Sequence, residues 1–278
     1  ALEAGRLNAA EGSVQVQRLE ASLTEILEKG ADAGFTLHAT LDWPDLKALA
    51  NLLPLPSLSG RLQGAVQVAG PWHAPAGTLR LEGENLVLAG TPLGTLDLTA
   101  RADGRWLAME TARLFSDQDR LDLSGRLGLA SGRFEDVRFA LAIADIGRYA
   151  EIVPLDVRPL EGKVSADLKI DGTLAAPEAT GDIALDEVTL GPVVLKQVRG
   201  RLDTDQEGMQ IEHLVLDAPH VHARLSGRID YPDASTPLIV QLETLTLKSA
   251  EERLALQAPA RILRRGDGRW QMEDILLA

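Results

Sequence analysis

The stretch Val164-Ser165-Ala166-Asp167-Leu168-Lys169-Ile170-Asp171 decides the fold of this sequence. Apolar and polar side chains alternate strictly in it, and a period of two places them on opposite faces of a β-strand. Comparable runs recur at intervals of about ten residues, separated by turn pairs such as Asp103-Gly104 and Asp171-Gly172. We therefore predict roughly twenty strands, mostly antiparallel, each with one apolar face.

The sequence pattern occurs twice, about a hundred residues apart. Leu58–Leu62 is matched by Leu160–Val164, and Leu123–Leu127 by Leu225–Ile229, both at an offset of 102 residues. Matched glycines and apolar positions over such a length predict an array that grows by stacking similar units.

Each repeat is predicted to begin with one short helix. Asp45–Leu53 and Asp145–Val153 start with an Asp that can cap a helix, carry apolar residues three and four apart, and stop at a proline. We therefore place a partial repeat at 1–44, full repeats at 45–144 and 145–247, and a truncated repeat at 248–278. Because the chain begins and ends within the pattern, we interpret it as a fragment of a longer protein.

Two all-β architectures could hide so many apolar strand faces from water. One is a sandwich of two packed sheets, and the other is a long, curled, mainly antiparallel sheet that forms a trough with an apolar lining. A repeat of about a hundred residues with a helix at each unit boundary favours the trough, since a sandwich has no reason to repeat at this interval. The residues predicted to line the trough are Leu62, Val66, Val68, Leu79, Leu81, Leu96, Leu98, Leu121, Leu123, Leu127, Phe139, Leu141, Val164, Leu168, Ile170, Ile183, Leu185, Leu225 and Ile229.

Composition excludes several classes of function. The 278 residues are 45% hydrophobic but only 4% aromatic, so the apolar surface is aliphatic and offers little stacking. A net charge of -13, with arginines dispersed among acidic residues, argues against nucleic acid and against an anionic membrane surface. The absence of cysteine excludes disulfides and thiol chemistry. No apolar run approaches the length of a membrane span.

The repeat unit consists of the predicted helix, a proline, Leu58–Leu62, the tract Val66–Gly70, Ala74-Pro75 and the strand Gly77–Leu81. It resembles the repeats of the TamB family, inner-membrane-anchored subunits of the translocation and assembly module, within the AsmA-like superfamily. The second copy matches from Asp145 through Ile183, and the tail from Leu245 to Leu277 also looks like the recurrent strands of the family. The resemblance therefore covers nearly the whole chain.

The resemblance implies both a fold and a function. Members of this superfamily look like β-tacos that span the periplasm, are similar to bridge-like lipid transfer proteins, and support outer-membrane biogenesis. By this resemblance the chain would be periplasmic and non-enzymatic, would need no cofactor, and would carry phospholipid acyl chains. A TamA-like outer-membrane barrel would be the partner of the full-length protein. The alternatives are an envelope scaffold that assists assembly of outer-membrane proteins without lipid, and an extracellular adhesin-like β-solenoid.

Few residues suggest other chemistry. Ser59–Arg61, Ser124–Arg126 and Ser226–Arg228 repeat a Ser-Gly-Arg motif, but no histidine repeats with it, so we attribute the glycines to bulges or bends. His220 and His222 would share a face on a strand near Asp217, yet no further metal ligand is evident.

Two other sets of residues have a structural interpretation. Asp117–Asp119 is interpreted as a solvated turn, without a metal or nucleotide. Trp72, Trp106 and Trp270 are expected to cap the ends of apolar rows, or else to form a lip that contacts lipid headgroups or a partner.

Overall fold

The computed structural model describes residues 2–9, 12–21, 32–47, 57–71, 73–152, 158–231, 238–249, 251–264, 270–273 and 276–278. It divides into two compact units, Ala1–Phe139 with Glu151–Pro154, and Ala140–Ala150 with Leu155–Ala278. Both units are all-β, and the division falls inside the ninth strand.

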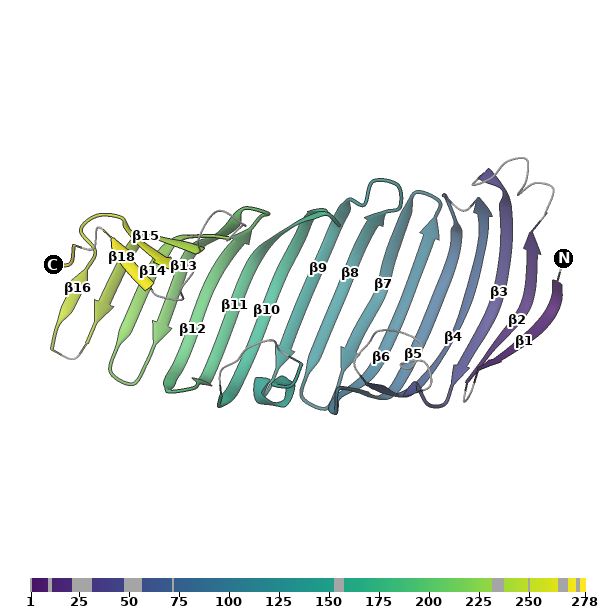
Figure 1. The fold of residues 1–278 in the computed structure, drawn as a ribbon, viewed down its shortest axis with the longest axis horizontal. Helices are drawn as coiled ribbons and strands as arrows, with labels where there is room; N and C mark the ends of the chain where they lie inside the picture. The colour runs from purple at the N-terminus through teal and green to yellow at the C-terminus, as the bar shows by residue number, and fades with distance from the viewer. Residues whose placement is uncertain are drawn as a thin grey trace. The chain divides into compact units, whose positions relative to one another are not determined.

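In the first unit, each strand pairs antiparallel with the next strand in sequence (Figure 1). Its strands are β1 (Leu2–Ala9), β2 (Gly12–Ala21), β3 (Gly34–Trp43), β4 (Leu58–Pro71), β5 (Ala76–Leu88), β6 (Thr91–Asp103), β7 (Trp106–Phe115), β8 (Arg120–Gly128) and the first part of β9 (Phe134–Ile143).

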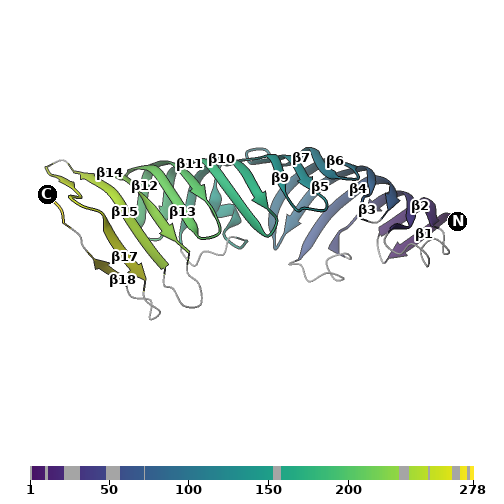
Figure 2. The ribbon, with the colours of Figure 1, turned by 90° about the horizontal axis from the view of Figure 1, so that it is seen from above.

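The second unit follows the same rule from β10 to β15, which lie side by side in Figure 2. The strand β15 then pairs with both β16 and β17, and β17 pairs with β18. The strands are β10 (Leu160–Thr173), β11 (Ala176–Leu190), β12 (Val193–Thr204), β13 (Gly208–Asp217), β14 (His222–Asp230), β15 (Leu238–Lys248), β16 (Arg253–Ala255), β17 (Ala260–Arg264) and β18 (Trp270–Glu273). Within each unit the described strands form an open antiparallel sheet, so the sandwich architecture is not observed.

The internal repeat of the sequence is visible in the strands themselves. β4, β7 and β8 recur as β10, β13 and β14, with both ends of each strand displaced by 102 residues. The Asp in the turn before β7 has a counterpart in the turn before β13, at the same offset. Asp103 Oδ1 accepts hydrogen bonds from two backbone amides of the β6–β7 turn, and Asp205 Oδ1 does the same in the β12–β13 turn. The two units therefore share a local plan, while the exact repeat boundaries remain a prediction.

The glycines of the repeated motif lie opposite β-bulges, which is one of the explanations that the sequence left open. Gly60 has a φ of 118° and faces Asn85, while Gly162 has a φ of 114° and faces Glu187. In both places the partner residue also has a positive φ, and the strand register shifts at the same point of the repeat. A β-carbon on either glycine would lie 2.7 Å from the partner's carbonyl oxygen, so only glycine fits without displacing the neighbouring strand.

These bulges change which residues of a strand face the apolar side. Along β5, Leu79 and Leu81 are followed by the bulge at Asn85, after which Leu86 and Leu88 take the same face. The apolar residues of β5 change from odd to even positions at this point. The extra residue of the bulge compensates for the change, and without it Leu86 and Leu88 would point to the polar face.

The predicted helices are only partly present. Asp145 caps the second one as expected, because its side chain accepts a hydrogen bond from the amide of Gly147. The element is nevertheless a four-residue 3-10 helix, Ile146–Tyr149, and not a helix over Asp145–Val153. A β-carbon on Gly147 would collide with the carbonyl oxygen of Leu160, so the turn is pressed against β10. In the first copy, Lys47 donates its amide to Asp45, and most of Asp45–Leu53 lies outside the described residues.

A small core forms where the chain leaves β3. Trp43, Leu46 and Leu86 are buried together, and Leu46 is only 2% exposed. The amide of Leu46 donates to the carbonyl of Gly60 at 2.9 Å, which ties this segment to the bulge. The side chains packed around the three are those of Leu41, Leu58, Leu62, Leu93, Leu96 and Leu114.

Replacement of Gly60 by alanine should destabilise the protein strongly. The positive φ and the close carbonyl of Asn85 both oppose a β-carbon, so we expect Gly60→Ala to lower the free energy of unfolding by about 2–4 kcal/mol in urea denaturation. Gly34→Ala is the control, because a β-carbon at Gly34 meets no atom within 4 Å, and it should change stability by less than about 1 kcal/mol. Equal stabilities of the two variants would contradict this assignment.

Candidate functional site

The apolar face of the first unit is continuous from strand to strand. Directly paired residues of an antiparallel sheet point to the same side, so the register defines rows that cross the sheet. One such row runs through Trp43, Leu62, Gly83, Leu96, Leu114 and Leu121.

The second unit has an equivalent face. A row of paired residues crosses β10 to β15 through Val164, Leu185, Val198, Leu216, Ala223 and Leu247. The side chains adjacent to them in sequence are mostly charged or polar and point to the other side.

The register places the predicted lining residues together on these faces. In the first unit the shared face carries Leu62, Val66, Val68, Leu79, Leu81, Leu96, Leu98, Leu121, Leu123 and Leu127. In the second unit it carries Val164, Leu168, Ile170, Ile183, Leu185, Leu225 and Ile229. Phe139 and Leu141 follow Val137 on β9 at intervals of two residues.

All nineteen of these side chains are half-buried. None is sealed from solvent, and none is fully exposed. A packed sandwich core would seal most of them, whereas the edge of such a core would expose several. The apolar face is thus half-buried along the sheet and is not the sealed interior of a packed core.

Glycines on this face bring neighbouring strands into close contact. Gly83 pairs with Leu62 and Leu96, and its missing side chain leaves space that Leu86 occupies. A β-carbon on Gly200 would lie 2.6 Å from Leu214 Cδ1. Side chains on this side of the sheet are therefore crowded, as expected on the inside of a bend.

The opposite face is held by ion pairs and hydrogen bonds between strands. Arg199 donates to both carboxylate oxygens of Asp186 at 3.0 Å, and Gln197 donates to one of them at 3.2 Å. The hydrogen bond from Gln197 and the adjacent Arg199 lower the pKa of Asp186.

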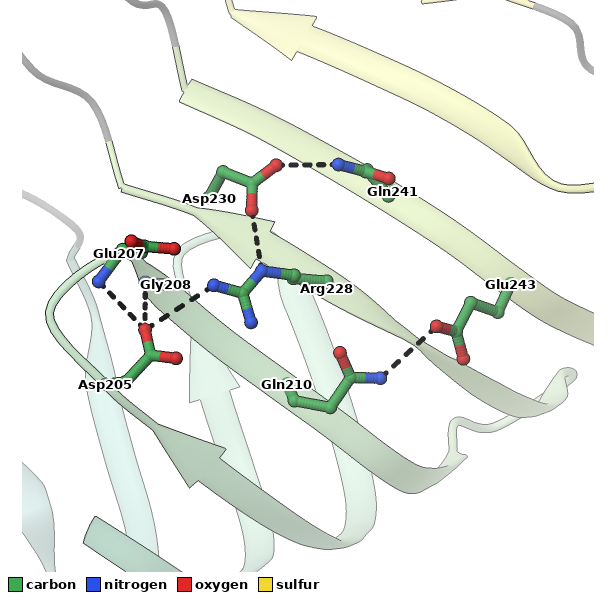
Figure 3. A network of polar contacts seen from close by, with 8 residues as sticks. All are labelled: Asp205, Glu207, Gly208, Gln210, Arg228, Asp230, Gln241 and Glu243. Atoms are coloured by element: carbon green, nitrogen blue, oxygen red, sulfur yellow. Dashed lines mark hydrogen bonds and ion pairs between the residues drawn. The ribbon is translucent and has the colours of Figure 1, made fainter. Parts of the chain in front are cut away.

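A further polar network lies on the same face of the second unit (Figure 3). Arg228 on β14 donates to Asp230 at 2.8 Å and approaches Asp205 at 3.5 Å, while Gln241 on β15 donates to Asp230 at 2.7 Å. Amide donors from Gly208 and Glu207 lower the pKa of Asp205. The arrangement links β13, β14 and β15.

The histidine pair does not meet the geometry that a metal site requires. β14 begins at His222, so His220 lies in the preceding turn, and the two do not share a strand face. His222 instead forms a short contact with Asp217 through Nδ1. Among the residues that the structure describes, no group of three or more His, Asp or Glu side chains is placed to hold a metal ion.

Two other expectations need correction. Asp119 is buried and not solvated, because it closes the β7–β8 turn through its contacts with Ser116. Trp106 does not cap an apolar row, because it pairs with Gly128 and points to the face away from the adjacent Leu107. There it lies beneath the guanidinium of Arg126, 5.6 Å from the ring centroid. Trp72 lies outside the described residues.

Sequence reasoning missed Trp43 and Leu46 as residues of the apolar face. The alternation along β3 could have identified Trp43, since Leu37, Ala39 and Leu41 lead directly to it. Leu46 follows the strand, and only the fold shows that it packs against the sheet.

Comparison with known proteins finds no matching family model, no similar curated protein and no similar solved structure. In the part of the chain that the structure describes, no helix has the length and apolar character needed to cross a membrane. The family resemblance therefore rests on the repeat motif alone.

The network around Asp205 should make stability depend on acid. Because the pKa of Asp205 is lower in the folded protein than in the unfolded chain, its contribution is complete above about pH 4 and is lost as the pH falls through the folded value. Asp205→Asn keeps an oxygen for the turn amides but removes the charge. We expect the variant to be less stable than the parent at pH 7, and the two urea unfolding curves to converge near pH 2. Asp117→Asn, in an exposed turn, is the control and should stay parallel to the parent at every pH.

Proposed function

We propose that this chain is a segment of a hydrophobic groove that conducts phospholipid acyl chains across the periplasm, in support of outer-membrane biogenesis. One observation carries the proposal. Each unit gathers its aliphatic side chains on one face of an open sheet, and those side chains remain half-buried. The crowded glycines favour a sheet that curls toward this face, as a trough requires.

An aliphatic lining suits transport better than a selective pocket does. Exposing an acyl chain to water costs about 0.8 kcal/mol per methylene, or on the order of 12 kcal/mol for a sixteen-carbon chain. A continuous apolar surface offsets that cost at every point along the path. Because few groups on the face can form directional bonds, no single position holds the chain tightly, and it can keep moving.

The proposal gives the two faces different tasks. Contacts such as the Arg199–Asp186 salt bridge and the Gln241–Asp230 hydrogen bond connect neighbouring strands on the outer side, so the sheet does not depend on a filled core alone. The function has no catalytic residue and needs no cofactor. By the family resemblance, a TamA-like barrel would receive the lipid at the outer membrane.

The test replaces one residue on each side of a single strand. Leu123→Glu places a charge on the apolar face, and Ser124→Glu places the same charge on the outer face of β8. Native mass spectrometry and lipid extraction should find phospholipid of mixed chain length on the parent and on Ser124→Glu. Leu123→Glu should lose most of it, since a buried carboxylate repels the acyl chain.

Circular dichroism and urea unfolding establish that each variant is folded. If Leu123→Glu does not fold, Leu168→Glu with Ser165→Glu repeats the comparison on β10. A folded parent protein that carries no lipid, even after incubation with phospholipid vesicles, would favour the envelope scaffold instead.

A further inference from the structure

Trp43 carries a hydrogen-bond donor into an apolar environment. It is the last residue of β3, it pairs with Leu62, and it therefore points to the apolar face. The residue is 8% exposed, and within the described part of the chain its indole Nε1 has no hydrogen-bond acceptor. Buried donors in native proteins are nearly always paired, so an orphaned one calls for a physical explanation.

Packing alone does not explain the donor. Phenylalanine or a large aliphatic residue could fill this position without an unpaired N–H. The second repeat makes that choice, because the last residue of β9, a hundred positions later, is Ile143. Asp45 and Asp145, which follow at the same offset, keep their capping hydrogen bonds in both copies. The indole at position 43 is thus a difference between two copies of the pattern that are otherwise similar at this point.

The surroundings of Trp43 restrict what could pair with it. Leu46 and Leu86 are buried against it, and six further leucines border the cluster. These neighbours are all aliphatic, so an anionic acceptor among them would be buried in apolar surroundings. A neutral carbonyl oxygen attached to an apolar chain satisfies both requirements, because it accepts one hydrogen bond and its chain can pack on leucine.

We propose that Trp43 is a binding position for the ester carbonyl of an acyl lipid in the groove. The acyl chain takes the place of the Leu46 side chain on the leucine cluster, and the indole N–H donates to the carbonyl. The Leu46 side chain can yield, because the residue lies beyond the end of β3 and a hydrogen bond from its amide to the carbonyl of Gly60 ties it to the sheet. This inference rests on the proposed function, and it adds a step at which a moving lipid pauses in a defined register.

The test compares two phosphatidylcholines that differ only in the ester carbonyls. Vesicles of ester-linked lipid and of ether-linked lipid with the same chains are offered to the protein, and bound lipid is quantified by native mass spectrometry. The parent should bind the ester form roughly two- to tenfold better, which is the range of one neutral hydrogen bond. Trp43→Phe should bind both forms equally. Trp106→Phe, on the opposite face, should keep the preference.

A second measurement does not depend on the variant folding well. In the parent, the indole N–H resonance of Trp43 should move downfield with ester-linked lipid and stay in place with ether-linked lipid. In the absence of lipid, Trp43→Phe should melt at a temperature equal to or above that of the parent, because the orphaned donor has been removed.

The possible failures are distinguishable. Equal binding of ester and ether lipid by the parent, with no shift of the indole resonance, would overturn the role of Trp43 and leave the groove intact. Failure of the parent to bind either lipid would overturn the proposed function, and this inference with it.

Discussion

The phase of side-chain alternation is the constraint on which the whole structure depends. In an antiparallel sheet, a slip of one residue exchanges the two faces of a strand, and here one face is aliphatic while the other carries ion pairs. A single slip would place leucines among salt bridges such as Arg199–Asp186. The spacing of apolar residues in the sequence changes at Asn85 and at Glu187, and a bulge at each place keeps these residues on the same face. Gly60 and Gly162 leave the space that each bulge needs. The glycine motif therefore preserves the apolar face.

Much of this organisation could be predicted from the sequence, because alternation is a local signal. The strand of Val164–Asp171 and the turn at Asp103-Gly104 both depend on residues close together in the chain, and the repeat was found by comparing such local patterns along it. The bulges were predicted only in general terms, although the sequence contains their signal. Apolar residues change from odd to even positions between Leu81 and Leu86, and again between Leu185 and Val188.

Other features depend on contacts that no local pattern encodes. An Asp before apolar residues caps an α-helix and a 3-10 turn equally well, so Asp145 could not indicate that the segment would be pressed against Leu160. In the same way, Trp106 is of a residue type that the sequence alone would place on the apolar side. Only the register with β8 reveals that it faces Arg126 on the polar side.

A groove for a mobile chain must be sheltered but not filled, and the two requirements conflict. Filling the face with aromatic side chains would stabilise the sheet and close the path, whereas leaving it bare would expose too much apolar surface to water. The half-buried aliphatic residues meet both conditions, and the stabilising contacts lie on the outer face and at the bulges. A polar group on such a lining differs from its aliphatic neighbours. The neighbours bind an acyl chain about equally well at every position, whereas the polar group favours one position of the chain. The donor of Trp43 is such an interruption, and Ile143 at the matching place in the second repeat leaves the surface there uniform.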